Sequence, residues 1–416
     1  MAGDVVLGLG GCVDYELKLS TPALERLVGE YRIRDAELTP SVRVADEREL
    51  VISILTYLKK GAGGEHFVAA AECLGAFAER FATRTTLGGT SVRAAKEMSR
   101  LGVPSILHLV SVNDVVRGLL PADCEYICSG DRDTLYPHLI IQYDQDLRVR
   151  AGDIDIRAPF ANRLIYVNDP ANESMLLSDG LGALLRGARV FLISGLNAIR
   201  DRRVLDRRLS ALRRHLRQLP AGALVYYEDA AFHEPEHSRR VRDALLEVID
   251  VYGLNEDELQ SHLGHAVDLL RVTEVARAIE SLHALIPVPT LVVHTKYWAA
   301  AFGDGAGRYA ESLNEGIVAA SARYRNGDDY TDRDRELLRT RPRRAEAVGF
   351  AAALQDHMGS IVRCLPGFRI DVAEPTTIGL GDAFVGGFLA AVAGERTRGA
   401  RTAHRRWPNG RSVWLG

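Results

Sequence analysis

The alternation of short apolar segments with helical segments constrains the fold of this chain more than any other feature. The apolar segments predict strands over residues 189–194, 223–227, 249–252 and 289–293. Helices are expected between them, for example over residues 202–218 and 236–247. Near-continuous apolar strands that alternate with helices are typical of a mostly parallel sheet with helices on both faces. The sequence therefore predicts a doubly wound α/β fold.

The N-terminal part of the chain fits the same pattern. Residues 5–11 read as a buried strand that ends in a glycine turn. This turn is not a dinucleotide-binding fingerprint, because Val13 stands where that motif needs a glycine. Further along, Gly88-Gly89 precedes a predicted helix over residues 92–101, and a strand over residues 105–110 follows. Both units are expected to belong to the large sheet or to border it.

Residues 121–162 depart from the α/β alternation. A strand over residues 139–143, a turn over 144–146 and a return arm over 147–150 are typical of a hairpin. Residues 22–60 are expected to be mostly helical. We therefore expect a small lid domain with a sheet of its own, and residues 162–167 are expected to re-enter the main sheet. The predicted division is a large domain of residues 1–14, 88–120 and 163–394, and a lid of residues 15–87 and 121–162.

Length, charge and cysteine content bound the class of protein. A chain of 416 residues suits one large domain and a smaller one. The formal net charge of -3 gives no general attraction to nucleic acid or to an anionic membrane. The five cysteines are scattered, as in a reducing compartment, and no apolar run is long enough to span a bilayer. We therefore expect a cytoplasmic monomer or small homo-oligomer with no nucleic-acid or membrane partner.

Two segments rich in charge are expected outside the core. The segment from Arg323 to Arg344 carries many charges of both signs and is predicted to be a solvated loop or surface helix. Residues 395–416 are rich in arginine and are predicted to form a disordered basic tail.

The sequence Gly379-Leu380-Gly381-Asp382 marks a turn that runs into a predicted helix. The glycines let the backbone come close to a ligand, and the free N–H groups at a helix start favour an anion. Asp382 is placed to accept a proton from an attacking hydroxyl, so the segment suits phosphoryl transfer. The alternative is that Asp382 is only the N-cap of a helix that packs on the core.

Polar side chains also follow three of the predicted strands. They are Glu228-Asp229, Asn255-Glu256-Asp257-Glu258 and His294-Thr295. The carboxyl ends of the strands in an open α/β sheet are where ligands bind. Carboxylates that meet there suit a hydrated Mg²⁺, and Arg163 is a candidate clamp for phosphate. Alternatively, the acidic run 255–258 only complements the dipole of a helix.

With these motifs in order, the chain resembles the ADP-dependent sugar kinases, the ADP-specific glucokinases and phosphofructokinases of the ribokinase-like superfamily. The matching stretches are Cys12-Val13-Asp14, Gly88-Gly89-Thr90, the segment that begins at His138, Ala158-Pro159 with Asn162-Arg163, Ser194-Gly195-Leu196, Tyr226 to Ala230, Gly253 to Leu259, His294-Thr295 and Gly379 to Asp382. The family transfers the β-phosphoryl group of ADP to a sugar hydroxyl and releases AMP.

The resemblance implies a role for each matching residue. Asp382 would be the general base, and the amides of Gly379 to Gly381 would form the anion hole. Glu228 and Glu258, with Asp382, would organise Mg²⁺. The ADP site would include Arg163, Asn255, His294, Thr295, Asp371, Val372, Gly379 and Gly381. The sugar site would include Asp14, Glu65, Gly89, Thr90 and His138.

Three departures from the family pattern fall mainly on the acceptor side. Tyr226-Tyr227-Glu228 replaces His-x-Glu, Thr90 replaces an asparagine after Gly88-Gly89, and Gln142 replaces a glutamate. The lead hypothesis is an ADP-dependent kinase of glucose or fructose 6-phosphate, and Glu65 favours glucose because a carboxylate would repel a sugar phosphate. The alternatives are an ATP-dependent ribokinase-type sugar or nucleoside kinase and a homologue that binds nucleotide or sugar without turnover.

Overall fold

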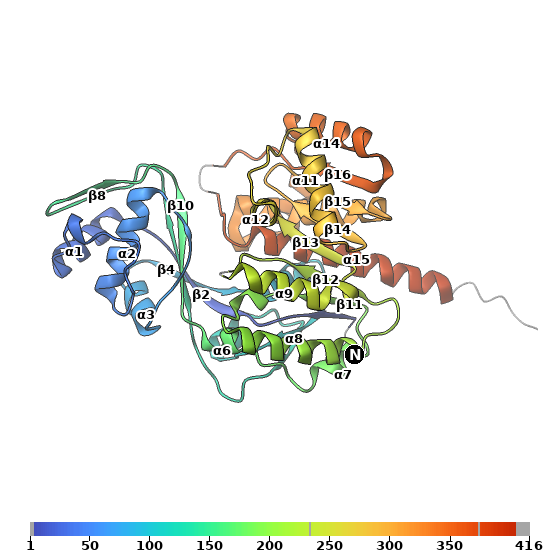
Figure 1. Cartoon of the computed structure of the whole chain (residues 1–416), viewed down its shortest axis with the longest axis horizontal. Helices are drawn as coiled ribbons and strands as arrows, with labels where there is room; N and C mark the ends of the chain where they lie inside the picture. Colours follow the sequence, from blue (N-terminus) through green and yellow to red (C-terminus); the bar gives the residue numbers. More distant parts are fainter. Residues whose placement is uncertain (1–3, 233, 373–374, 405–416) are drawn as a thin grey trace, which may run out of the picture.

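The structure is a computed structural model that describes residues 4–232, 234–372 and 375–404, with side chains described as far as Glu395. It has a large lobe and a small lobe, joined by long strands (Figure 1). The large lobe contains a nine-stranded sheet in the order β16-β15-β14-β13-β12-β11-β1-β5-β6. Its strands are β1 (Val5–Leu7), β5 (Ser105–Leu109), β6 (Cys124–Cys128), β11 (Val190–Ile193), β12 (Leu224–Glu228), β13 (Val251–Asn255), β14 (Thr290–His294), β15 (Trp298–Gly303) and β16 (Val362–Pro366).

The large sheet is mostly parallel, as the sequence predicts. β15 runs antiparallel to both of its neighbours, and the other neighbouring pairs are parallel. Alternate residues of each strand point to opposite faces, so Tyr226 and Tyr227 belong to different apolar clusters. The expected strands over 189–194, 223–227, 249–252 and 289–293 are confirmed as β11 to β14, with ends that shift by a few residues.

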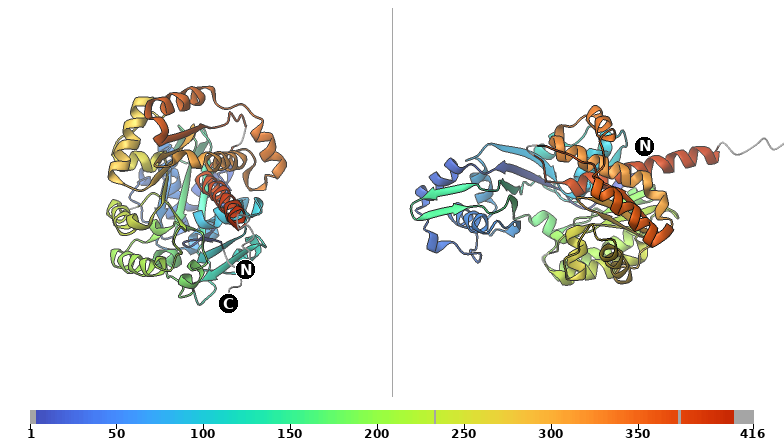
Figure 2. Two further views of the ribbon diagram at one scale, coloured as in Figure 1. Left: turned by 90° about the vertical axis from the view of Figure 1, so that its right-hand side faces the viewer. Right: turned by 90° about the horizontal axis from the view of Figure 1, so that it is seen from above.

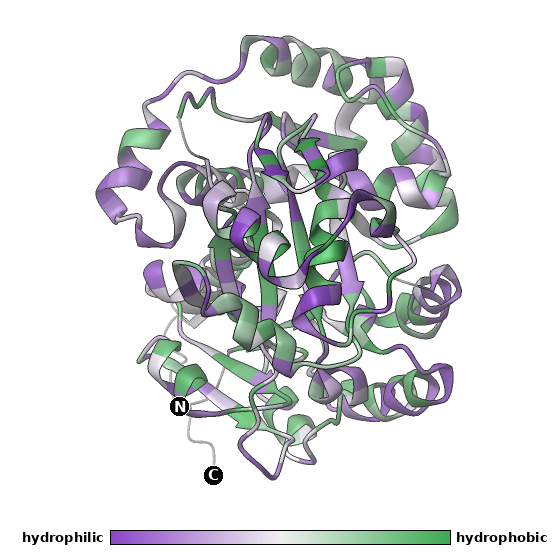
Figure 3. Cartoon of the chain, turned by 90° about the vertical axis from the view of Figure 1, so that its left-hand side faces the viewer, coloured by the Kyte–Doolittle hydropathy of each residue, from purple (hydrophilic) through white to green (hydrophobic). Residues whose placement is uncertain are grey.

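Helices cover both faces of this sheet (Figure 2). One face packs on α7 (Leu181–Leu185), α8 (Arg202–Leu216), α9 (Pro235–Leu245), α10 (Glu256–Leu263), α11 (Val272–Leu285) and α14 (Ala345–Met358). The other packs on α4 (Thr90–Arg100), α12 (Ala310–Asn326) and α15 (Leu380–His404). Short helices α5 (Asp114–Leu119), α6 (Pro170–Ser174) and α13 (Asp332–Arg339) complete the large lobe. Apolar strands lie inside, and the helices mix apolar and polar residues (Figure 3).

The small lobe is built on a five-stranded sheet in the order β3-β10-β7-β2-β4. Its strands are β3 (Gly64–Phe67), β10 (Asn162–Val167), β7 (His138–Tyr143), β2 (Cys12–Lys18) and β4 (Thr83–Gly88). One face is apolar and packs on α1 (Thr21–Tyr31), α2 (Glu47–Lys60) and α3 (Glu72–Ala78). The strand registers place Asp14, Glu16, His138, Thr86 and Arg163 together on the opposite, polar face.

Three strand assignments differ from the expectation. Residues 162–167 pair with β3 and β7 of the five-stranded sheet and do not re-enter the main sheet. The arm over 147–150 does not pair back on 139–143. It forms β8 (Arg148–Ala151), which pairs with β9 (Ile154–Arg157). Residues Cys124–Cys128, expected in the lid, form β6 at the edge of the nine-stranded sheet. An apolar strand signal does not identify the sheet that the strand joins.

The two charged segments also differ from their predictions. Arg323 and Arg335, expected in solvent, are each only 4% exposed. Arg323 forms an ion pair with Asp328, and Arg335 forms one with Glu315 at 2.9 Å. The predicted disordered tail begins inside α15, which continues as a helix to His404, and residues 405–416 lie outside the described residues. Within the described chain, no helix is both long enough and apolar enough to cross a membrane.

Candidate active site

The turn before α15 brings the backbone of the large lobe into close contact with two other elements. Gly379 has φ of +65°, a left-handed conformation that suits glycine, and its carbonyl accepts the first helical hydrogen bond from Ala383 at 3.1 Å. A Cβ atom at Gly379 would lie 2.7 Å from Nη1 of Arg93, and one at Gly381 would lie 3.2 Å from Cε1 of His294. A side chain at Gly379 would strain the left-handed backbone and press on Arg93, and one at Gly381 would crowd His294.

Close packing of glycines holds α15 against its neighbours. A Cβ atom at Gly386 would lie 2.6 Å from Cβ of Glu97 on α4, and one at Gly387 would lie 2.6 Å from the carbonyl oxygen of Glu315 on α12. On the facing helix, a Cβ atom at Gly316 would lie 2.6 Å from the Phe384 ring. These contacts set the position of the helix that carries Asp382.

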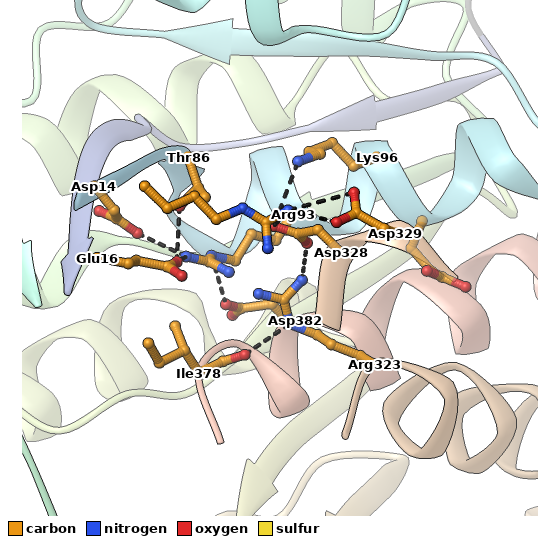
Figure 4. A network of polar contacts seen from close by, with 12 residues as sticks. Asp14, Glu16, Thr86, Arg93, Lys96, Arg323, Asp328, Asp329, Ile378 and Asp382 are labelled. Atoms are coloured by element: carbon orange, nitrogen blue, oxygen red, sulfur yellow. Dashed lines mark hydrogen bonds and ion pairs between the residues drawn. The ribbon is translucent and has the colours of Figure 1, made fainter. Parts of the chain in front are cut away.

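Asp382 lies in the first turn of α15, where its side chain is 23% exposed. Its Oδ2 lies 3.7 Å from Nε of Arg93 on α4. The same guanidinium donates from Nη2 to Asp14 at 2.7 Å and to Glu16 at 3.0 Å (Figure 4). Arg93 thus connects the polar face of the five-stranded sheet with the start of α15.

Arg93 is buried, and its charge depends on these carboxylates. Burial opposes the charge, but Asp14, Asp382 and Glu16 outweigh it and raise the pKa of Arg93 above its usual range. Its Nη1 is buried without a hydrogen-bond partner among the described residues. Sequence reasoning missed Arg93 because an arginine in an amphipathic helix reads as a solvent-facing residue.

Asp14 and His138 meet on the polar face of the five-stranded sheet. They are paired across β2 and β7, and Nδ1 of His138 lies 3.9 Å from Oδ1 of Asp14. Nε2 of His138 lies 3.2 Å from Asp169, which also accepts from Asn172 at 2.6 Å. Gly88 leaves the space that Asp14 occupies, because a Cβ there would overlap both carboxylate oxygens.

The other residues predicted for the sugar site do not all lie close to Asp14. Gly89, with φ of +88°, precedes α4, and a Cβ there would lie 3.0 Å from Cα of Gly11. Thr90 is the first residue of α4 and is partly exposed. Glu65 is exposed on the edge strand β3. The register puts Glu65 three strand spacings from Glu16, or about 14 Å. The structure does not bring Glu65 into the Asp14 cluster.

The carboxyl ends of β12 and β14 bring Glu228 and His294 together. Nε2 of His294 lies 2.8 Å from Oε1 of Glu228, and the Tyr226 hydroxyl donates to Oε2 at 3.2 Å. Tyr226 therefore supplies a hydrogen-bond donor to this carboxylate. Burial raises the pKa of Glu228, an effect that His294 opposes and that Asp382 reinforces. The imidazole of His294 stacks on Phe384 of α15, with ring centroids 4.7 Å apart.

Asn255 and Glu258 form the capping box of α10. Oδ1 of Asn255 accepts from the amides of Asp257 at 2.7 Å and Glu258 at 3.1 Å, and Oε2 of Glu258 accepts from the Asn255 amide at 2.8 Å. Residues 255–258 therefore have a structural role at the start of the helix, as the alternative interpretation of this motif expects. Glu258 is nevertheless unusual, because burial and the nearby carboxylates of Glu228 and Asp229 raise its pKa to about 8.

Glu228 and Glu258 offer the ligand chemistry that Mg²⁺ takes. The groups are carboxylate oxygens, the ligand type that Mg²⁺ prefers. Burial raises the pKa values of both Glu228 and Glu258; Asp382 adds to this effect at Glu228, and Glu228 and Asp229 add to it at Glu258. A divalent cation beside these carboxylates would relieve a charge that the nearby side chains leave only partly compensated.

The remaining predicted nucleotide-site residues have identifiable partners. Nη1 of Arg163, on β10, donates to the carbonyl of Thr377 at 3.2 Å and so bridges the two lobes at the glycine turn. Oγ1 of Thr295 accepts from the amides of Tyr297 at 3.1 Å and Trp298 at 3.0 Å, which closes the turn between β14 and β15. Asp371 is exposed and pairs with Arg369 at 3.5 Å, and Val372 is partly buried.

Comparison with solved structures shows the same two-lobed α/β fold in known kinases. A hypothetical ADP-dependent phosphofructokinase from Pyrococcus horikoshii OT3 matches with a TM-score of 0.76 and 18% identity over 95% of this chain and 99% of that chain. An ADP-dependent kinase in complex with fructose-6-phosphate and ADPβS matches with a TM-score of 0.68 and 12% identity over 94% of each chain. The fold is therefore that of the ADP-dependent kinases.

The sequence itself identifies the family. Residues 3–337 match the model of the ADP-specific phosphofructokinase/glucokinase conserved region. The chain belongs to this family, which confirms the resemblance read from the motifs. Gly379 to Asp382 lie beyond the matched residues, and the structural matches extend over most of the chain. A search of curated proteins finds no match.

Proposed function

We propose that this protein is an ADP-dependent kinase that transfers the β-phosphoryl group of ADP to a hydroxyl of glucose or fructose 6-phosphate. The observation that carries the proposal is the position of Asp382. It lies at the start of α15, after the glycine turn, and faces the Arg93 guanidinium that also holds Asp14. The base, the anion-binding turn and the acceptor face are thus adjacent.

Each group has a part in the transfer. Asp382 accepts the proton of the attacking sugar hydroxyl. The amides from Gly379 to Gly381 bind the oxygens of the transferred phosphoryl group. Arg93 holds Asp14 toward the acceptor and keeps its charge balanced. Glu228 and Glu258 would hold Mg²⁺, whose charge would offset that of the phosphate oxygens. ADP would lie beside Asn255 and His294, with Arg163 at its phosphates.

The choice of sugar rests on the polar face of the small lobe. Arg84 stands on this face and suits a phosphorylated sugar, as does the likeness to phosphofructokinases. Glu65 stands on the same face, at its far edge, and suits neutral hydroxyls. Fructose 6-phosphate is therefore the first acceptor to test, and glucose is the second.

The test is an assay of AMP formation by the purified chain with Mg²⁺, comparing ADP with ATP and glucose with fructose 6-phosphate. Asp382→Asn should lower turnover by roughly 10²–10⁴-fold. Asp304→Asn, at an exposed turn after β15, is the matched control and should leave turnover unchanged. No phosphorylated sugar with ADP, or full activity of Asp382→Asn, would contradict the proposal. Turnover with ATP in place of ADP would favour the ribokinase-type alternative.

The state of the cysteines supports a proposal for the cellular location. All five are free, as suits a reducing compartment, so we infer a cytoplasmic protein.

A further inference from the structure

Cys12, Asp14 and His138 form a compact cluster of metal-binding side chains, separate from the carboxylates proposed for Mg²⁺. Their ligand atoms all lie within 4.8 Å of one another. We propose that this cluster is a binding site for a thiophilic divalent cation of the zinc class, and that the cation excludes the sugar from the acceptor face. The second half of this statement rests on the proposed function, and the first half does not.

Strand geometry explains why these side chains meet. Cys12 and Asp14 are two residues apart on β2 and therefore point to the same face of the sheet. His138 is the direct neighbour of Asp14 on the adjacent strand β7. Neighbouring residues in register lie about 5 Å apart at Cβ, which is within reach of one ion. The cluster is thus built on paired strands.

The distances between the ligand atoms are close to those around a tetrahedral ion. Zinc binds sulfur at about 2.3 Å and nitrogen or oxygen at about 2.0–2.2 Å, which puts tetrahedral ligand atoms about 3.3–3.7 Å apart. Here Sγ of Cys12 lies 3.2 Å from Oδ1 of Asp14, and Nδ1 of His138 lies 3.9 Å from the same oxygen. Small side-chain shifts would complete the geometry.

The surrounding groups orient the ligands as they do in known zinc sites. Nε2 of His138 lies 3.2 Å from Asp169, and a carboxylate behind a histidine directs its other nitrogen toward the metal. Asp169 is held by Asn172 at 2.6 Å. Arg93 engages only Oδ2 of Asp14, so Oδ1 remains on the side of Cys12 and His138.

The site is partly exposed to solvent. The side chain of His138 is 21% exposed, and Cys12 is partly exposed, so an ion can enter. Three protein ligands leave a fourth position for water or another ligand. A thiol and an imidazole prefer zinc over Mg²⁺, whereas the carboxylates of Glu228 on β12 and Glu258 on α10 prefer Mg²⁺. The two sites therefore select different cations.

Binding of the metal ion would displace a proton from the site and would compete with binding of the sugar. Metal coordination would release the proton of the Cys12 thiol to solvent, since the thiolate is the ligand. Asp14 and His138 are also the proposed contacts of the sugar hydroxyls, so the same atoms cannot serve both. Zinc should therefore raise the apparent KM for sugar without changing that for ADP.

The direct test uses Co²⁺ as a spectroscopic substitute for zinc on the purified full-length chain. Wild type should bind one Co²⁺ with a thiolate charge-transfer band, and Zn²⁺ should remove the band by displacement. Cys12→Ser should abolish the band and weaken Zn²⁺ binding at least 10-fold, whereas the matched control Cys128→Ser, on β6, should retain both. The absence of a band in wild type, or its retention in Cys12→Ser, would overturn the metal site.

The second measurement separates this inference from the proposed function. Sugar, or a non-reactive sugar analogue, should displace Co²⁺ from the wild-type protein in a titration that needs no turnover. Bound Co²⁺ that no acceptor displaces would overturn the competition with sugar and leave the metal site standing. Failure of the kinase assay would leave both binding measurements interpretable.

Discussion

The proposed acceptor side and the proposed donor side of this site hold their carboxylates in opposite ways. On the acceptor side, Asp14 and Glu16 share one buried guanidinium, that of Arg93. On the donor side, Glu228 has His294, but burial still raises its pKa, and the pKa of Glu258 is raised to about 8. The counter-charge of the first side is a residue of the chain, whereas the carboxylates of the second side are only partly compensated by the side chains around them. The comparison separates a proposed sugar face, whose counter-charge lies within the chain, from a proposed nucleotide face that would need a cation.

Removing the internal counter-charge should have the largest effect. Arg93→Met leaves the buried Asp14 and the partly buried Glu16 without their cation, and breaking a buried pair such as Arg93–Asp14 costs about 3–5 kcal/mol of unfolding free energy. Chemical denaturation measures this loss of unfolding free energy. The double variant Arg93→Met with Asp14→Asn should recover part of the loss, because one unpaired charge is gone. Wild-type stability of Arg93→Met would refute the idea that the acceptor face depends on this guanidinium.

A buried carboxylate whose charge is only partly compensated should behave in the opposite way, because removing its charge should stabilise the protein. Burial raises the pKa of Glu97 on α4 to about 7, although Arg100 lies 3.5 Å away. The folded protein then binds a proton that the unfolded chain releases, so stability falls as pH rises from about 4.5 to about 7. Glu97→Gln should therefore stabilise by up to about 3 kcal/mol at pH 8 and by little at pH 4.5. Melting temperatures across pH measure this, and an equal effect at both pH values would contradict it.

The donor side is tested through its dependence on Mg²⁺. Glu258→Gln removes one of the carboxylates that the cation would stabilise, and we expect the Mg²⁺ concentration for half-maximal turnover to rise by roughly 10-fold. Asp257→Asn, exposed in the same first turn of α10, is the control and should show the wild-type requirement. If the two variants have the same Mg²⁺ dependence, Glu258 acts only as part of the helix cap.

The smallest effect is expected at Thr295, where a substitution distinguishes a structural role from a role in nucleotide binding. Thr295→Val removes the hydroxyl that accepts from the amides of Tyr297 and Trp298, at a cost of about 1 kcal/mol of unfolding free energy. Because the hydroxyl is already used in the turn, the KM for ADP should change little. A large rise in that KM with unchanged stability would instead assign Thr295 to the nucleotide.

The sequence predicted the α/β class, the strands β11 to β14 and the glycine turn before α15. These features are local, since apolar runs and glycine spacing are visible in short windows. It did not predict that residues 162–167 join the smaller sheet, because strand pairing depends on partners far along the chain. The same reason hid Arg93, whose carboxylates lie on β2 and α15. It also hid the burial of Arg323, which depends on Asp328 and the carbonyl of Ile378.

The glycines of α15 couple helix packing to chemistry at a distance. Gly386 lies one helical turn beyond Asp382, and a methyl group there would meet α4 at 2.6 Å. To accommodate it, the helix would have to slide or tilt, and the carboxylate at its start would move with it. A displacement of about 1 Å can cost roughly 100-fold in rate. A substitution buried between two helices, in contact with neither substrate, would thus lower the reaction rate while leaving the protein folded.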